Sequence, residues 1–359
     1  MGTSRPSLDL ARFPRIPMLA APTPIEPLER LSRHLGAALG GVRLFAKRDD
    51  VAGVGGGGNK LRKLEYLLGA ARAEGADTVI TVGALQSNHA RLTAAAAARC
   101  GFACELFLTR SVPRTDADYT RNGNRMLDDL FGATVHERPA EADALAEAQA
   151  RAADLRARGR GVYVFPSGGS SPTGCLAYAA CAAEILDQAD ALGFDPAAIV
   201  TANGSGGTHA GLAAGLSALG RDPRIARSYA VLAPEAEARA IVLGKARDTL
   251  ALIGAPSALA EGDVVVDGAA RGPGYGIPTA AMRDTVRLMA RTEGLLLDPV
   301  YGGKAFAGLL HDIRAGAYRP GDAVVFLMTG GVPGLFAYRE TFEAPEGAQE
   351  GAPGGATAP

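Results

Sequence analysis

Short apolar segments alternate along this chain with longer stretches of helical periodicity. Aliphatic and β-branched residues dominate the segments at 78–82, 103–108, 161–165, 199–202, 228–232, 264–266 and 323–328. Between them, Lys60–Glu74 repeats leucine at helical spacing, with Asn59 as the expected N-cap, and Arg91–Arg99 is rich in alanine. Nearly continuous apolar strands separated by helices are typical of parallel sheets covered on both faces. The pattern therefore predicts an α/β protein of mostly parallel, twisted sheets flanked by helices.

Glycine-rich or polar turns follow many of these strands. They lie at residues 55–60, 84–89, 167–174, 203–209 and 329–334. In open α/β sheets, ligands bind at the carboxyl ends of the strands. The repetition of such turns predicts a single cleft that is built from several segments of the chain.

Composition and charge exclude some classes of protein. A chain of 359 residues that is 47% hydrophobic and 21% charged is ordinary for a globular protein and long enough for two domains. Its net charge of −1 gives no basic footprint for nucleic acid, and no apolar run is long enough to span a membrane. Residues 1–15 lack the apolar core of a signal peptide, so we expect a cytoplasmic protein.

The cysteines and the C-terminal segment add two expectations. Cys100, Cys104, Cys175 and Cys181 match no common zinc-ligand spacing, so we expect small buried side chains and no metal site. Residues 343–359 are largely Gly, Pro, Ala and Glu. Such a segment has too little apolar content to offset the entropy of ordering, and we predict a disordered tail.

The turn at residues 203–209 has the chemistry of a phosphate-binding loop. Gly204, Ser205, Gly206, Gly207 and Thr208 follow an apolar strand and open a helix, where bare N–H groups favour an anion. The dinucleotide motif G-x-G-x-x-G fails, because position 209 is a histidine. A single phosphate group therefore fits better than a pyrophosphate. A tight structural turn is the alternative.

Lys60 stands at the expected start of a helix, which is an unusual place for a cation. The positive end of the helix dipole lowers the pKa of the amine, which suits a lysine that forms a Schiff base. Lys63 lies one turn later on nearly the same face and is placed to neutralise a phosphate. The order Gly58-Asn59-Lys60-Leu61 lacks the Gly-Lys-Ser/Thr of a nucleoside-triphosphate loop. A solvated lysine is the alternative.

Two further pairs complete the candidate site. Ser87 and Asn88 follow a strand at the start of a helix, where they can hold a carboxylate or a phenolate oxygen or serve only as a helix cap. Tyr275 and Tyr301 each lie in a turn rich in glycine and proline, which suits proton transfer. Packing is the alternative role for either ring.

Together these segments resemble one family of enzymes that use pyridoxal 5′-phosphate (PLP). It contains D-cysteine desulfhydrase, L-cysteate sulfo-lyase and 1-aminocyclopropane-1-carboxylate deaminase, and the resemblance is strongest to the desulfhydrases. Matching segments run in family order at residues 11–14, 46–50, 57–65, 86–91, 122–124, 168–170, 204–211, 273–276, 298–301 and 329–331. The resemblance implies the two-domain fold type II, similar to the tryptophan synthase β-subunit. It places a large domain at residues 1–62 and 172–342, an inserted small domain at 63–171, and PLP in the cleft between them.

The resemblance also implies a role for each candidate residue. Lys60 matches the lysine that forms the Schiff base with PLP and moves the α-proton, and Lys63 matches one that helps to hold the phosphate. Asn88 matches the asparagine beside the PLP hydroxyl, and Ser87 matches the serine near the substrate carboxylate. The loop at residues 204–208 matches the phosphate loop, and Tyr275 and Tyr301 match two active-site tyrosines.

Residue 302 separates the members of this family. The residue after the second tyrosine lies near the pyridine nitrogen; it is a glutamate in the deaminases and a small hydroxyl residue in the desulfhydrases, whereas this chain has Gly302. Opening a cyclopropane ring needs a strong electron sink, so the missing carboxylate argues against the deaminase. Thr329 or a water molecule is then the expected neighbour of the ring nitrogen. The favoured activity is a carbon–sulfur lyase that eliminates hydrosulfide from D-cysteine.

Other functions stay open at this stage. L-Cysteate sulfo-lyase runs the same elimination with sulfite as the leaving group, and Arg121 is a candidate contact for a sulfonate. A deaminase, a racemase, a β-substitution enzyme and a non-catalytic ligand sensor are further alternatives. The resemblance implies a homodimer that acts on a small amino acid, and no nucleic-acid or membrane partner is expected.

Overall fold

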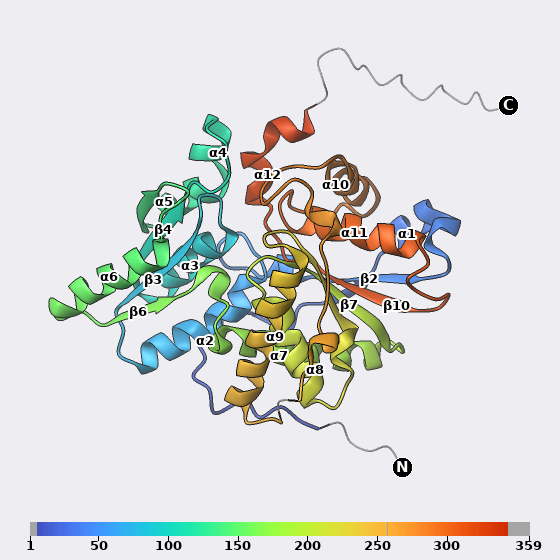
Figure 1. The fold of residues 1–359 in the computed structure, drawn as a ribbon, viewed down its shortest axis with the longest axis horizontal. Helices are drawn as coiled ribbons and strands as arrows, with labels where there is room; N and C mark the ends of the chain where they lie inside the picture. The colour runs from blue at the N-terminus through green and yellow to red at the C-terminus, as the bar shows by residue number, and fades with distance from the viewer. Residues whose placement is uncertain (1–5, 257, 344–359) are drawn as a thin grey trace.

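The computed structural model describes residues 6–256 and 258–343, which form an α/β architecture with two separate sheets (Figure 1). The strands are β1 (Ile25–Pro27), β2 (Arg43–Lys47), β3 (Thr78–Ala84), β4 (Ala103–Thr109), β5 (Thr134–Arg138), β6 (Val162–Phe165), β7 (Pro196–Asn203), β8 (Ala226–Ala230), β9 (Val265–Asp267) and β10 (Ala323–Leu327). The α-helices are α1 (Glu29–Leu35), α2 (Lys60–Ala73), α3 (Asn88–Cys100), α4 (Ala117–Arg121), α5 (Gly123–Leu130), α6 (Ala144–Ala157), α7 (Pro172–Ala191), α8 (Gly207–Ala218), α9 (Glu235–Ile253), α10 (Ala280–Glu293), α11 (Gly302–Arg314) and α12 (Pro333–Ala337).

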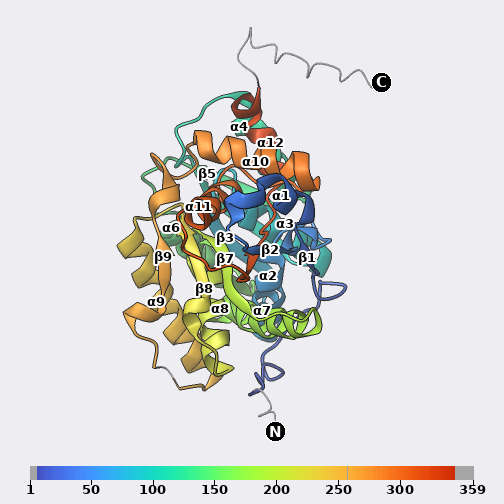
Figure 2. The ribbon, with the colours of Figure 1, turned by 90° about the vertical axis from the view of Figure 1, so that its right-hand side faces the viewer.

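The larger sheet has six strands in the order β1-β2-β10-β7-β8-β9. β1 pairs antiparallel with β2, and the other neighbouring strands pair in parallel. Helices α1, α10 and α11 cover one face of this sheet, and α7 and α8 cover the other (Figures 1 and 2). β10, the last strand along residues 6–343, lies in the interior of the sheet between β2 and β7.

Strand β10 shows why the strand segments of the sequence are almost entirely apolar. Successive side chains of a strand point to opposite faces of the sheet. Val324 and Phe326 pack in the core beneath α10 and α11, whereas Val325 and Leu327 pack in the core beneath α7 and α8. A strand that is buried on both faces therefore reads as a nearly continuous apolar run.

The smaller sheet has four parallel strands in the order β5-β4-β3-β6. Val79 and Leu106 pack in one core with residues of α3, and Ile80 and Phe107 pack in another with residues of α6. Parallel sheets with helices on both faces confirm the predicted fold class. The division into domains at residues 1–62, 63–171 and 172–342 stays a prediction, and its first boundary falls within α2.

The structure differs from the sequence prediction at several short elements. β1, β2 and β5 were not predicted; β2 begins and ends with a charged residue, and β5 lies at a sheet edge, where polar residues are common.

The predicted N-cap at Asn59 is wrong. Its backbone is helical (φ −61°, ψ −20°) and its side chain makes no capping bond, whereas an N-cap needs a non-helical backbone.

Two further expectations concern the chain as a whole. Of the predicted disordered tail, residues 344–359 lie outside the described residues. No helix within residues 6–256 and 258–343 is both long enough and apolar enough to cross a membrane.

Asp49 is a buried carboxylate at which several segments meet. It accepts hydrogen bonds from Thr23 Oγ1 at 2.8 Å, Arg62 Nε at 3.0 Å and Tyr178 Oη at 2.6 Å. Arg62 also pairs with Glu184 at 2.8 Å. Buried charges are tolerated only when partners satisfy them, so this network fixes the first turn of α2 against α7.

We expect Asp49→Ala to destabilise the protein by about 3–5 kcal/mol, because it leaves the buried Arg62 guanidinium short of a partner. Urea unfolding followed by circular dichroism measures the loss. Asp154→Ala is the matched control, since Asp154 pairs with Arg151 and Arg158 near the protein surface, and this variant should leave the midpoint nearly unchanged. Equal midpoints for the two variants would contradict the prediction.

Candidate active site

The residues singled out by the sequence converge on one cavity of about 250 Å³. Its wall draws on the turns after β3, β6, β7 and β10 and on the turn before α2, as the sequence predicts. The predicted residues that line it are Lys60, Ser87, Asn88, Gly204, Ser205, Gly206, Gly207, Thr208, Tyr275, Tyr301 and Thr329. Lys63 does not line the cavity and lies behind the loop at 204–208.

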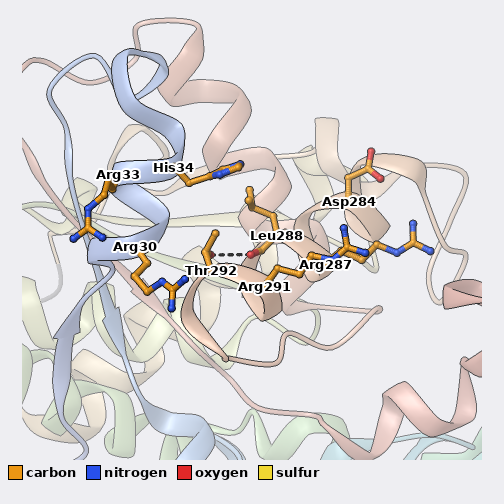
Figure 3. A pocket seen from close by; sticks show the side chains of 8 residues that line it. All are labelled: Arg30, Arg33, His34, Asp284, Arg287, Leu288, Arg291 and Thr292. Carbon is orange, nitrogen blue, oxygen red and sulfur yellow. Dashed lines mark hydrogen bonds between the residues drawn. The ribbon is translucent and has the colours of Figure 1, made fainter. Parts of the chain in front are cut away.

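A wider depression of about 620 Å³ lies between α1 and α10 and contains none of the predicted site residues (Figure 3). Arginines make up half of its lining, and they spread over it: Arg33 points to one side, and Arg287 and Arg291 point to the other (Figure 3). The chemistry of the smaller cavity is therefore the better guide to function.

Lys60 presents its amine to the cavity from the first residue of α2. Its Nζ donates to Asn59 Oδ1 at 2.8 Å, and the described residues provide no carboxylate in contact with it. Burial lowers the pKa of Lys60 to about 8, although the more distant charges of Asp298 and Asp49 act in the opposite direction. Burial is thus the main cause of the lowered pKa, whereas the sequence argument had relied on the helix dipole. More of this amine is therefore unprotonated near neutral pH than of an ordinary lysine.

The loop at 204–208 leads into α8 and offers bare backbone to the cavity. Gly206 adopts a left-handed conformation (φ +83°), and no side chain caps the helix. The first N–H groups of a helix have no partner within it, so they are available to an anion. A Cβ atom on Gly207 would lie 2.4 Å from Ser170 Oγ and 2.9 Å from Lys63 Nζ, which shows how closely the loop packs.

Lys63 supports this loop from behind. Its Nζ donates to Gly168 O at 3.2 Å and to Ser170 Oγ at 3.0 Å, and Ser170 Oγ lies 2.7 Å from Ser205 Oγ. Burial and the charge of Lys60 lower the pKa of Lys63 to about 7. An arriving anion would favour its charged form, because an opposite charge nearby stabilises the ammonium group.

Ser87 and Asn88 stand at the start of α3. Ser87 caps the helix, and its Oγ accepts from the Ala90 N–H at 3.1 Å, so its own hydroxyl proton remains free to donate. The N-terminus of a helix favours negative charge. This end of the cavity therefore suits an oxyanion such as a carboxylate.

Tyr275 and Tyr301 lie side by side, with hydroxyl oxygens 2.6 Å apart. Burial raises the pKa of both phenols, so each carries its proton at neutral pH. Lys304 holds the turn that carries Tyr275, since its buried Nζ donates to the carbonyl oxygens of Arg271 and Gly274 at 2.7 and 2.9 Å. The pair can pass a proton from one hydroxyl to the other.

Asp298 is a buried carboxylate to which the sequence analysis gave no role. It accepts the backbone N–H groups of Val300, Tyr301 and Gly302 at 3.0, 2.9 and 2.6 Å and so orients Tyr301. Burial raises its pKa to about 6 in spite of these bonds. The N–H of Gly302 is fully engaged, and the position of Gly302 relative to a pyridine nitrogen stays a prediction.

His89 is neutral and held in one tautomer. Thr81 Oγ1 donates to Phe165 O at 2.9 Å, so it accepts from His89 Nε2 at 3.0 Å, and Nδ1 keeps a lone pair. Burial and the charges of Lys60 and Lys63 hold the pKa of His89 well below its usual value. This tautomer could not be predicted from the neighbouring residues, because Thr81 lies on β3 and Phe165 on β6, whereas His89 lies on α3.

The donors around the cavity fit PLP. The loop at 204–208 and Lys63 offer backbone and ammonium donors to a phosphate, and no carboxylate belongs to that loop. The Lys60 amine lies in the same cavity and can bind an aldehyde, and Asn88 and Ser87 offer polar groups to the remaining oxygen atoms. Each residue's individual role stays a prediction.

The comparison with protein families is decisive. The model of the family described as "Pyridoxal-phosphate dependent enzyme" matches residues 16–330. The chain belongs to this family. The predicted PLP cofactor is thereby confirmed, as is the prediction of an enzyme.

Related PLP-dependent enzymes are similar along nearly their whole length. A D-cysteine desulfhydrase of Salmonella choleraesuis (strain SC-B67) is 43% identical over 92% of this chain and 97% of its own. One of Salmonella typhi is 42% identical with the same coverage. A crystal structure of an "ACC deaminase homologue" superposes with a TM-score of 0.81 at 36% identity, covering 93% of this chain and 96% of that one. An O-ureido-L-serine synthase, at 18% identity and a TM-score of 0.60, shares the fold.

The lowered pKa of Lys60 predicts how the PLP-free protein takes up its cofactor. Only the unprotonated amine attacks the aldehyde, so the rate of covalent PLP binding should rise with pH and level off above about 8. Stopped-flow absorbance measures this rate. A rate that keeps rising toward the ordinary lysine pKa of about 10.4 would show that burial does not lower the pKa of this amine.

The packing of the phosphate loop makes a second prediction. Gly207→Ala places a methyl group against Ser170 and Lys63, and we expect PLP affinity to fall by roughly tenfold or more. Equilibrium titration of the PLP-free protein measures the affinity. Gly244→Ala in α9 is the control, because a Cβ atom there meets nothing within 4 Å. Unchanged affinity in Gly207→Ala would contradict the described packing.

Proposed function

We propose that this protein is a PLP-dependent carbon–sulfur lyase that converts D-cysteine and water into pyruvate, hydrogen sulfide and ammonia. The observation that carries the proposal is the geometry of one cavity, in which the Lys60 amine and the paired hydroxyl groups of Tyr275 and Tyr301 face a common space. The similarity to D-cysteine desulfhydrases over 92% of the chain supports the choice of substrate.

Lys60 is the group that moves the substrate α-proton. When bound, PLP supplies the electron sink that makes this proton acidic. The Lys60 amine, with its pKa lowered to about 8, accepts the proton near neutral pH and releases it again. No other amine lines the cavity within the described residues, since Lys63 is turned toward Gly168 and Ser170.

Ser87 and the start of α3 bind the substrate carboxylate. The Ser87 hydroxyl donates its free proton, and the N-terminus of α3 supplies a favourable dipole. A carboxylate fixed at this end directs the rest of a small amino acid toward the remaining walls of the cavity.

Tyr275 and Tyr301 donate hydrogen bonds to the departing hydrosulfide. Their raised pKa values keep both hydroxyl groups protonated, and the 2.6 Å contact between their hydroxyl oxygens holds them side by side. Hydrosulfide departs as a stable anion, so a hydrogen bond is enough and no proton has to be transferred to it. Gly302 supplies no carboxylate, which favours this elimination over the opening of a cyclopropane ring.

We further propose that the protein works as a homodimer in the cytoplasm. The homodimer rests on the family resemblance, and the cytoplasm is the compartment expected from the sequence. Size-exclusion chromatography with light scattering measures the first, and fractionation of cells measures the second.

The substrate test compares products from both enantiomers of cysteine and from L-cysteate. We expect sulfide and pyruvate in equal amounts from D-cysteine, and Lys60→Ala should abolish turnover. Sulfite from L-cysteate without sulfide from cysteine would replace the proposed activity by a sulfo-lyase. Release of 2-oxobutanoate from 1-aminocyclopropane-1-carboxylate would replace it by a deaminase.

A further inference from the structure

A buried network links Arg91 of α3 to the cavity. Arg91 Nε donates to Asn124 Oδ1 at 3.0 Å, and its NH1 group donates to Gly57 O at 2.8 Å and to Gly55 O. Asn124 Nδ2 donates in turn to Asn88 Oδ1 at 2.8 Å. Arg91 and Asn124 are fully buried, whereas Asn88 lines the cavity. The network therefore runs from a structural guanidinium to a residue that faces the ligand.

The chemistry of the guanidinium group determines the orientation of both amides. Burial lowers the pKa of Arg91 to about 10, which still leaves it cationic and purely a donor at neutral pH. Asn124 must therefore present its oxygen to Arg91 and its NH₂ group to Asn88. Asn88 must then present its oxygen to Asn124, which leaves its own NH₂ group for the cavity. This Nδ2 atom finds no acceptor within the described part of the chain.

We propose that Arg91 and Asn124 are positioning residues that hold Asn88 as a hydrogen-bond donor to the ring hydroxyl oxygen of PLP. The inference rests on the proposed function, since it requires PLP in the cavity. A donor at this point stabilises the anionic form of the oxygen, and hydrogen bonds to charged acceptors are the stronger ones. An amide in the opposite orientation would present an oxygen to that anion and repel it.

The same guanidinium also fixes the approach to Lys60. Its bonds to the carbonyl oxygens of Gly55 and Gly57 hold the turn that leads into α2. Gly57 (φ +78°) has no room for a side chain, because a Cβ atom would lie 2.1 Å from Asp50 O. Arg91 thus fixes the position of the Lys60 amine relative to the Asn88 amide.

Asn124→Asp tests the inference by removing the NH₂ group that Asn124 donates to Asn88 and also, at 3.0 Å, to Gln86 O. A carboxylate still accepts from Arg91 but cannot donate to Asn88, so the Asn88 amide turns and presents its oxygen to the cavity. We expect the dissociation constant of PLP to rise about 10- to 100-fold. The visible absorption band of the bound cofactor should lose intensity to shorter wavelengths as the ring oxygen becomes protonated.

Two variants keep the test decisive. Asn88→Asp also removes the donor, while it leaves Asn124 correctly oriented, and it should weaken PLP binding in the same direction even if Asn124→Asp folds poorly. Asn122→Asp is the matched control: Asn122 caps α5 through its oxygen, which accepts from the Gly123 N–H, and aspartate caps equally well. It should bind PLP as the parent protein does. Circular dichroism and thermal unfolding of the PLP-free proteins check that each variant is folded.

The outcomes separate this inference from the proposed function. Parental affinity and spectrum in a folded Asn124→Asp would overturn the role of Asn124, and the same result in Asn88→Asp would overturn the donor itself. Either result leaves sulfide release from D-cysteine and its loss in Lys60→Ala untouched. A parent protein that binds no PLP would instead defeat the proposed function.

Discussion

The buried carboxylate of Asp49 is the contact on which the position of the reactive amine depends. Its partner Arg62 lies in the first turn of α2, between Lys60 and Lys63. Helix positions two residues apart point in different directions, so Arg62 can be anchored in the protein while Lys60 faces the cavity. Tyr178 donates to Asp49 and lies 3.3 Å from the Asn59 carbonyl oxygen. The Lys60 amine is thus positioned by Asp49 and Arg62, neither of which lines the cavity.

The cavity also depends on the absence of side chains at a few positions. Gly57 and Gly207 pack so closely on their neighbours that any larger residue would displace them. These contacts bring backbone N–H groups and the Lys60 amine into one small space. The cavity is therefore a product of close packing around it.

The strands and helices that could be predicted from the sequence are those whose pattern of apolar and polar residues is local. Strands such as β10 were predicted correctly because all of their residues are buried and apolar. β2 was missed because charged residues stand at both of its ends, and β5 was missed because it lies at a sheet edge and is largely polar. The site residues were recognised through the family resemblance. The roles of Arg91 and Asp298 could not be predicted, because neither burial nor distant partners can be read from neighbouring residues. The pKa of Lys60 was predicted in direction, but its main cause, burial, depends on the whole fold.

The place of β10 in the larger sheet has a consequence for how the chain acquires its structure. β10 is the last strand within the described residues, yet it pairs with β2 and β7 on its two sides. Until the ribosome has released residues 323–327, β2 and β7 have unpaired edges and no neighbour to bridge them. Contacts between such distant parts of a chain form slowly, and exposed strand edges favour aggregation. The two halves of the larger sheet can therefore join only after residues 323–327 have emerged, and Thr329 reaches the cavity only then.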